Sequence, residues 1–121
     1  MTTIYGIKNC DTMKKAFAWL DEHGVSYTFH DYKKSGIDSA RLHAWSKAIG
    51  WKSLVNTRGT TWRKLPAERQ AIDTQSAAVQ LMLEFPSLIR RPVIETDGGQ
   101  LLVGLDLALY TSFLAPEGKA E

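Results

Sequence analysis

The sequence predicts an α/β fold built on a mixed four-stranded sheet. Three observations carry this prediction. The chain begins with a strand, a helix and a second strand, continues through a long helical stretch, and ends with a hairpin and a closing helix. A strand–helix–strand unit is typical of parallel pairing, whereas a hairpin pairs its strands antiparallel. The two ends of the chain therefore predict one mixed sheet with helices on it, interrupted by an all-helical insertion.

The opening part of the chain carries the first strand–helix–strand pattern. Residues 2–5 are mostly β-branched or aromatic and predict a strand. A helix is predicted over 12–22, with Asp11 or Thr12 as the residue that caps its first turn. Strict alternation over 25–30 predicts the second strand. The apolar side chains that recur at helical spacing in the helix are Met13, Ala16, Phe17 and Leu20.

The helical insertion is predicted over about 32–87. Residues 31–36 are expected to form a loop, and residues 51–65 are expected to be irregular. The predicted helices are one over 40–49 capped by Asp38 or Ser39, a short one opening at Pro66 or Ala67, and one capped by Asp73 or Thr74 that ends at Pro86.

The closing part of the chain predicts a hairpin and a helix. Residues 93–95 form the expected third strand, and Asp97-Gly98-Gly99 is a strong turn signal. The fourth strand is expected over 100–103 and the last helix over 105–114. A single domain is therefore expected over 1–114, and the tail over 115–121 is expected to be poorly ordered.

Composition narrows the class of protein. The chain has 121 residues, enough for one domain with its own core. Its formal net charge of +2 gives no general field for nucleic acid or membranes, so neither is an expected partner. No targeting segment is evident, and no apolar stretch is long enough to span a bilayer. With one cysteine in the chain, these features predict a cytoplasmic protein.

Cys10 lies between the first strand and the first helix and is the candidate nucleophile. A sulfur at a helix N-terminus faces unpaired N–H groups and the positive end of the dipole, both of which favour the thiolate. Lys8 adds a positive charge nearby, so we predict that the pKa of Cys10 lies below its ordinary value. The alternative is a small buried core residue, but the polar neighbours indicate a solvent-facing turn. A lone thiol also excludes an intrachain disulfide and argues against structural zinc.

Four segments carry a resemblance to a known family. They are YGIKNCDTMKKA over 5–16, FHDY over 29–32, NTRGTTWRKL over 56–65 and RRPV over 90–93. The resemblance covers nearly the whole chain, from residue 2 to about residue 114. The sequence resembles the arsenate reductase (ArsC) family, and within it the YffB-type branch, which implies a thioredoxin-like fold.

The resemblance also implies roles for individual residues. Cys10 matches the family's nucleophile, Arg58 and Arg91 match arginines that hold an oxyanion near the sulfur, and Pro92 matches a proline that follows a cis peptide bond. We accordingly expect a cis Arg91–Pro92 bond with the Arg91 side chain directed toward Cys10. The planar fork of arginine suits carboxylates and oxyanions better than lysine does. The alternative for both arginines is a solvated surface position. Three further residues complete the predicted substrate- and glutathione-binding set, namely Lys8, Asn9 and Thr12.

Three departures separate the chain from its better-known relatives. Arsenate reductases of this type carry an arginine after the fourth strand, where this chain has 102–105 without a basic residue. They also carry a histidine where this chain has Gly6. Spx-type regulators, which are otherwise similar, have a second cysteine where this chain has Met13. An internal disulfide switch is therefore excluded, and any disulfide at Cys10 must involve an external thiol.

The leading hypothesis is a glutathione-dependent thiol or disulfide reductase with one nucleophilic cysteine. No bound cofactor or metal is expected, and glutathione is the expected reducing co-substrate. The other expected partners are a small anionic or disulfide substrate and, as a further candidate, glutaredoxin. Two alternatives stay open at this stage: arsenate reduction, and Spx-like binding of RNA polymerase without catalysis.

Overall fold

The structure is a computed structural model of the chain and describes residues 2–114. The chain divides into two compact units. The first combines Met1–Ser35 with Arg91–Glu121, and the second is Gly36–Arg90. The tail predicted over 115–121 lies outside the described residues.

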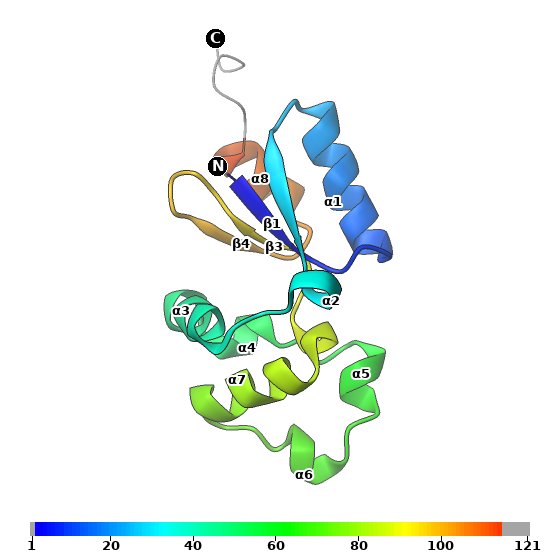
Figure 1. Cartoon of the computed structure of the whole chain (residues 1–121), viewed down its shortest axis with the longest axis vertical. Coiled ribbons are helices and arrows are strands. Elements are labelled where there is room, and N and C mark those ends of the chain that lie inside the picture. Colours follow the sequence, from blue (N-terminus) through cyan, green and yellow to red (C-terminus); the bar gives the residue numbers. More distant parts are fainter. Residues whose placement is uncertain (1, 115–121) are drawn as a thin grey trace. The chain divides into compact units, whose positions relative to one another are not determined.

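A four-stranded sheet forms the centre of the first unit (Figure 1). The strand order is β2-β1-β3-β4, with β2 parallel to β1 and the other neighbours antiparallel. The predicted mixed sheet is therefore confirmed. The elements of this unit are β1 (Thr2–Gly6), α1 (Asp11–Glu22), β2 (Tyr27–Asp31), α2 (Tyr32–Ser35), β3 (Val93–Glu95), β4 (Leu101–Val103) and α8 (Leu107–Phe113).

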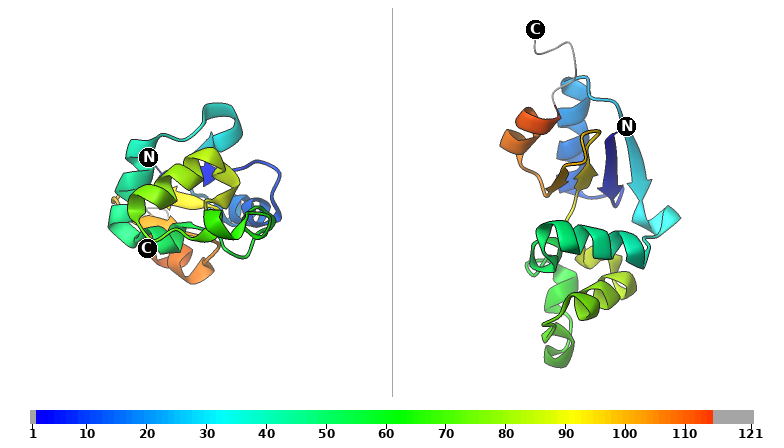
Figure 2. Two further views of the ribbon diagram at one scale, coloured as in Figure 1. Left: turned by 90° about the horizontal axis from the view of Figure 1, so that it is seen from below. Right: turned by 90° about the vertical axis from the view of Figure 1, so that its left-hand side faces the viewer.

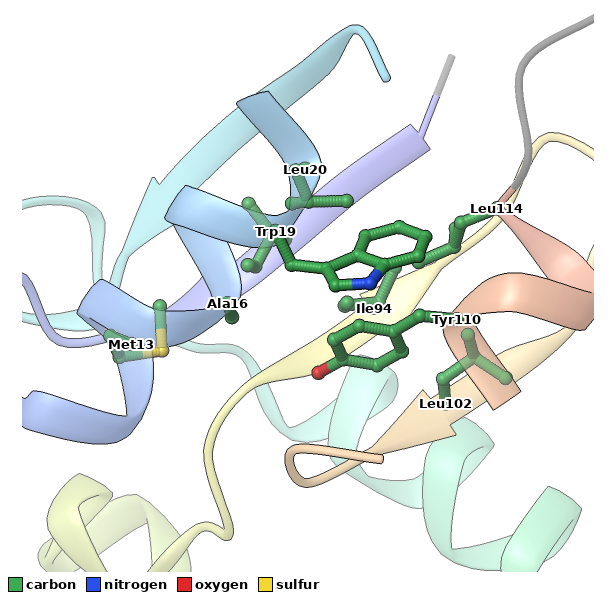
Figure 3. Packing of buried hydrophobic residues seen from close by; sticks show 9 residues of the cluster. Met13, Ala16, Trp19, Leu20, Ile94, Leu102, Tyr110 and Leu114 are labelled. Carbon is green, nitrogen blue, oxygen red and sulfur yellow. The ribbon is translucent and has the colours of Figure 1, made fainter. Parts of the chain in front are cut away.

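The apolar core of this unit lies between one face of the sheet and the helices α1 and α8. Figure 2 shows both helices on the same side of the sheet. The rings of Trp19 from α1 and Tyr110 from α8 meet edge to face at 5.5 Å (Figure 3). This contact joins the two helices, and the Tyr110 hydroxyl donates to the carbonyl of Gly104 at 2.7 Å. The sheet contributes Ile4, Ile94 and Leu102 to the same cluster.

The second unit is helical. Its elements are α3 (Ser39–Ile49), α4 (Trp51–Leu54), α5 (Thr60–Arg63), α6 (Ala67–Gln70), α7 (Gln75–Glu84) and the 3₁₀ turn η1 (Pro86–Leu88). Helix α3 packs against α4 and α7. An antiparallel bridge joins Val55, just after α4, to Ile89, just after η1. The buried side chains of α3, α4 and α7 include Leu42, Trp45, Leu54, Val79 and Met82.

Two predicted helix starts in the second unit are confirmed by their caps. The Asp38 side chain accepts from the Arg41 N–H at 2.7 Å, and the Thr74 hydroxyl accepts from the Ala77 N–H at 3.1 Å. Both side chains satisfy N–H groups that have no partner inside a helix, and this is why they mark helix starts.

Several predicted boundaries are wrong. Residues 31–36 are not all loop, because the Asp31 carboxylate accepts from the Lys33 N–H at 2.9 Å and starts α2. Residues 51–65 contain the one-turn helices α4 and α5, which are too short to show a hydrophobic period. The second strand starts at Tyr27, and the last helix starts after Asp106, whose carboxylate accepts from the Leu109 N–H at 3.2 Å.

The structure also bears on the expectation of no membrane span. Among residues 2–114, no helix combines the length and the apolar character that crossing a bilayer requires.

Candidate active site

Cys10 is itself the N-cap residue of α1, so the prediction of Asp11 or Thr12 as the cap is wrong. Its backbone is extended, with φ −134° and ψ 132°, and its carbonyl accepts the first helical bond from the Lys14 N–H at 2.9 Å. A cap residue points its side chain back over the first turn of the helix. The chain therefore places the sulfur at the N-terminus of a twelve-residue helix.

The environment of Cys10 lowers the pKa of its thiol below the ordinary value. Partial burial alone would raise this pKa, since it disfavours a charge. The N–H groups of Met13 and Thr12 and the guanidinium of Arg91 outweigh that effect. Cys10 is thus suited to be a thiolate nucleophile.

Arg91 is the cation beside the sulfur. Its side chain hydrogen-bonds to Cys10 and adds a Coulombic attraction to the thiolate. The peptide bond between Arg91 and Pro92 is cis, so both expectations for this pair are confirmed. Pro92 is buried, and its carbonyl accepts from the Gly104 N–H at 2.8 Å. Lys8 is exposed and is not among the groups that lower this pKa, so its predicted contribution to the acidity of Cys10 has no support.

Arg91 also faces a polar cluster that the sequence analysis did not single out. Tyr32 is 3% exposed, and burial raises the pKa of its hydroxyl. Tyr5 and Glu95 raise that pKa further, whereas Arg91 opposes the rise. The Tyr5 hydroxyl donates to Glu95 Oε1 at 2.6 Å. The rings of Tyr5, His30 and Tyr32 extend the cluster. The centroid of the His30 ring lies 5.0 Å from that of Tyr5 and 6.1 Å from that of Tyr32.

This cluster, comprising Tyr5, His30, Tyr32, Arg91 and Glu95, is a polar layer next to the nucleophile. Because Tyr32 is buried, its hydroxyl cannot readily ionise, and it stays a neutral dipole near the guanidinium. The signal that could have revealed the layer was strand alternation. Tyr5 and Glu95 both point away from the face that holds Ile4 and Ile94, and the pairing of β1 with β3 brings them within reach.

Met13 fills the position where Spx-type regulators have a second cysteine. Its side chain is fully buried and packs directly onto Gly6. A Cβ atom on residue 6 would lie 2.5 Å from the Met13 sulfur, closer than any real contact. A side chain on residue 6 would therefore compete with the Met13 side chain for the same space. Cys10 has no partner thiol within the chain.

The remaining predicted site residues have different positions. Thr12 contributes its backbone N–H to the thiolate, while Asn9 and Lys8 are exposed on the loop that precedes Cys10. Arg58 belongs to the second unit, where it is exposed and its N–H donates to Asn56 Oδ1 at 3.0 Å. The role of Arg58 at Cys10 therefore stays a prediction.

Metal binding has no support within residues 2–114, where no group of three or more His, Cys, Asp or Glu side chains could hold an ion. The arrangement instead suits attack by sulfur on a substrate that carries a negative charge. The helix N-terminus and Arg91 hold the thiolate, and the guanidinium can also bind a carboxylate or oxyanion. Such a site can carry out thiol–disulfide exchange.

The model of the ArsC family matches residues 5–113 of the chain. A solved structure of a YffB protein is 50% identical, has a TM-score of 0.90, and is covered over its whole length by 95% of this chain. An arsenate reductase (ArsC) related protein from Brucella melitensis is 51% identical, with a TM-score of 0.74 and 92% of each chain covered. The global transcriptional regulator Spx 1 of Lactococcus lactis is 30% identical over 97% of this chain and 91% of its own length.

Proposed function

The chain belongs to the ArsC family, and from this premise we propose that it is a glutathione-dependent thiol–disulfide reductase whose nucleophile is Cys10. The observation that carries the proposal is the sulfur at the α1 N-terminus, hydrogen-bonded to Arg91 and with its pKa lowered. A thiolate is the reactive form in disulfide exchange, and an adjacent guanidinium attracts an anionic thiol such as glutathione.

The reaction begins with attack by the Cys10 thiolate on one sulfur of a substrate disulfide. A bond forms between Cys10 Sγ and that sulfur, the substrate S–S bond breaks, and the other substrate half leaves as a thiolate. A glutathione thiolate then attacks Cys10 Sγ, which releases the second substrate half and leaves Cys10 joined to glutathione. A second glutathione attacks the glutathione sulfur of this adduct. Cys10 returns as a thiolate, and the two glutathione molecules leave as their disulfide, so the electrons balance.

Because residue 13 is methionine, the mixed disulfide on Cys10 must be resolved by a thiol from outside the chain. A second cysteine at this point of the helix would release the substrate by forming an internal disulfide, but Met13 is a buried thioether and cannot react in this way. The cycle therefore depends on a thiol from solution. Glutathione is anionic overall, and Arg91 beside the sulfur supplies a binding partner for one of its carboxylates. Lys8, Asn9, Thr12 and Arg58 complete the proposed binding set.

The test is intact-protein mass spectrometry after incubation with oxidised glutathione. We expect one glutathionyl adduct on the wild type and none on Cys10→Ser, and we expect reduced glutathione to remove the adduct. Arg91→Ala should raise the KM for glutathione by the equivalent of one charge-assisted contact, about 1.5–3 kcal/mol. The adjacent exposed Arg90 provides a matched control, and Arg90→Ala should leave KM unchanged. An adduct that glutathione cannot remove would contradict the proposal.

Two competing activities are separated by direct assays. Arsenate reduction is expected to be weak or absent, because Gly6 and Gly104 stand where arsenate reductases have the histidine and an arginine. Arsenate-dependent oxidation of NADPH, coupled through glutathione reductase, measures it. A pull-down with the RNA polymerase α-subunit tests the regulatory alternative. Strong binding to the α-subunit without disulfide reduction would favour that alternative instead.

A further inference from the structure

A groove lined by aromatic side chains begins at the loop that carries the nucleophile. Its volume is about 380 Å³. One end is formed by Lys8, which is two residues from Cys10 and therefore within about 7 Å along the backbone. Lys34 and Ser35, at the C-terminal end of α2, also line the groove, and α2 follows β2 directly (Figure 1). The lining residues are Lys8, Phe17, Tyr27, Phe29, Asp31, Lys34 and Ser35.

Three rings form the apolar wall of this groove. Phe17 of α1 stacks on Tyr27 of β2 with 5.7 Å between the ring centroids. It meets Phe29 of β2 edge to face, with 5.0 Å between the centroids. All three side chains are half-buried and pack against the core of the first unit. Cys10 packs against the same core. The rings therefore keep a fixed arrangement while part of each ring stays open to solvent, so that burial by a ligand stabilises the complex.

The charges at the groove favour an anion. Lys8 and Lys34 contribute positive charges, and both side chains are exposed. The one acidic lining residue, Asp31, is 8% exposed and already accepts the hydrogen bond from the Lys33 N–H that caps α2. The two positive charges of Lys8 and Lys34 outnumber the one negative charge of Asp31. An occupant that combines an aromatic ring with a carboxylate therefore matches both the wall and the rim.

We propose that this groove binds the substrate half of the mixed disulfide on Cys10, and that the preferred substrates are disulfides of aromatic thiols that carry a carboxylate. The proposal rests on the function proposed above and specifies its substrate class. In the first exchange step, the substrate sulfur bonds to Cys10 and its ring lies against Phe17 and Phe29. The carboxylate lies near Lys34 or Lys8. The other substrate half leaves as a thiolate, as in the cycle above.

The experiment compares two aryl disulfides that each release a coloured thiol. Dithiobis-nitrobenzoate carries a carboxylate on each ring, whereas dithiodipyridine is uncharged. The rate of the first exchange with Cys10 is measured for both. Alkylation by iodoacetamide, which has no ring, reports the intrinsic reactivity of the sulfur.

The expected results separate the rings from the charges. Phe29→Leu should slow both aryl disulfides by about two- to tenfold, the cost of one aromatic contact, and leave alkylation unchanged. Lys34→Gln should slow only dithiobis-nitrobenzoate, by about two- to fivefold for one exposed ion pair. Its neighbour Lys33 is exposed but does not line the groove, so Lys33→Gln is the matched control.

Failure of this proposal is distinguishable from failure of the proposed function. If folded Phe29→Leu reacts with both aryl disulfides at the wild-type rate, or if Lys34→Gln matches Lys33→Gln, the groove is not the substrate site, even though oxidised glutathione still modifies Cys10. If Cys10 is alkylated but exchanges with no disulfide at all, both the groove proposal and the proposed function are overturned. Circular dichroism spectra of each variant show that the fold is retained.

Discussion

The two faces of the sheet in the first unit differ in chemistry although they share the same strands. One face holds Ile4 and Ile94 under α1 and α8, and its cluster is almost entirely apolar. The opposite face holds Tyr5, His30 and Glu95, which are joined by a hydrogen bond and a ring contact. Because side chains alternate along a strand, a single run of residues builds both faces.

The difference shows how stability and reactivity are divided in this unit. The apolar face holds α1 in place and so fixes the turn at which Cys10 lies. Arg91 lies next to the polar face and lowers the pKa of the Cys10 thiol. We therefore expect changes on the apolar face to act mainly on stability. Changes at Arg91 should act mainly on the acidity of the thiol.

The largest effect is expected for Tyr110→Ala on the apolar face. Tyr110 is fully buried, contacts Trp19 and donates to Gly104. Loss of a large buried ring costs about 3–5 kcal/mol in the free energy of unfolding, measured by urea denaturation. Tyr110→Phe keeps the ring and should cost only about 1–3 kcal/mol, since it leaves the Gly104 carbonyl without this donor. Equal losses in both variants would mean that packing of the ring is not what matters.

The next effect concerns the contact between Gly6 and Met13. Gly6→Ala should lower the free energy of unfolding by about 1–3 kcal/mol, because the added Cβ meets the buried Met13 sulfur at 2.5 Å. Replacing Met13 as well, in Gly6→Ala/Met13→Ala, shortens that side chain without adding a thiol and should cost less than the sum of the two single changes. Additive costs in urea denaturation would contradict the contact as the cause.

Some features of the fold could be predicted from residues close together in the sequence, and others depend on contacts between distant residues. The order of strands and helices followed from periodicity, and the caps Asp38 and Thr74 followed from residue type. Strand alternation could place Tyr5 and Glu95 on the same face of the sheet, but it could not bring them together, because they meet only through the pairing of strands far apart in the sequence. Lys8 was expected to add to the acidity of Cys10 because it is close along the chain, but it is not among the groups that lower this pKa. The direction of Arg91 came from the family resemblance.

A smaller effect, on acidity and not on stability, is expected for Arg91→Gln. The guanidinium lowers the pKa of Cys10 by a hydrogen bond and by Coulombic attraction, so its loss should move the midpoint of the pH dependence of iodoacetamide alkylation upward. At neutral pH the alkylation rate should fall severalfold, because less thiolate is present. Lys8→Gln should leave the midpoint in place. A midpoint that moves equally in both variants would show that any nearby cation is sufficient.

The smallest effect is the contribution that ionisation of Cys10 makes to the pH dependence of the free energy of unfolding. The pKa of Cys10 is lowered in the folded protein, so folding favours the thiolate. Its contribution is fully present above the pKa of the unfolded thiol, about 8.5, and is lost as pH falls through the lower folded pKa. The stability of the wild type relative to Cys10→Ser should therefore rise with pH across this window and then level off. Because Cys10 is only partly buried, the rise should be smaller than the effects above. Urea denaturation at a series of pH values measures it, and in the Arg91→Gln background the rise should shrink, since the guanidinium that favours the thiolate is gone. A relative stability that falls with rising pH would show that folding disfavours the thiolate.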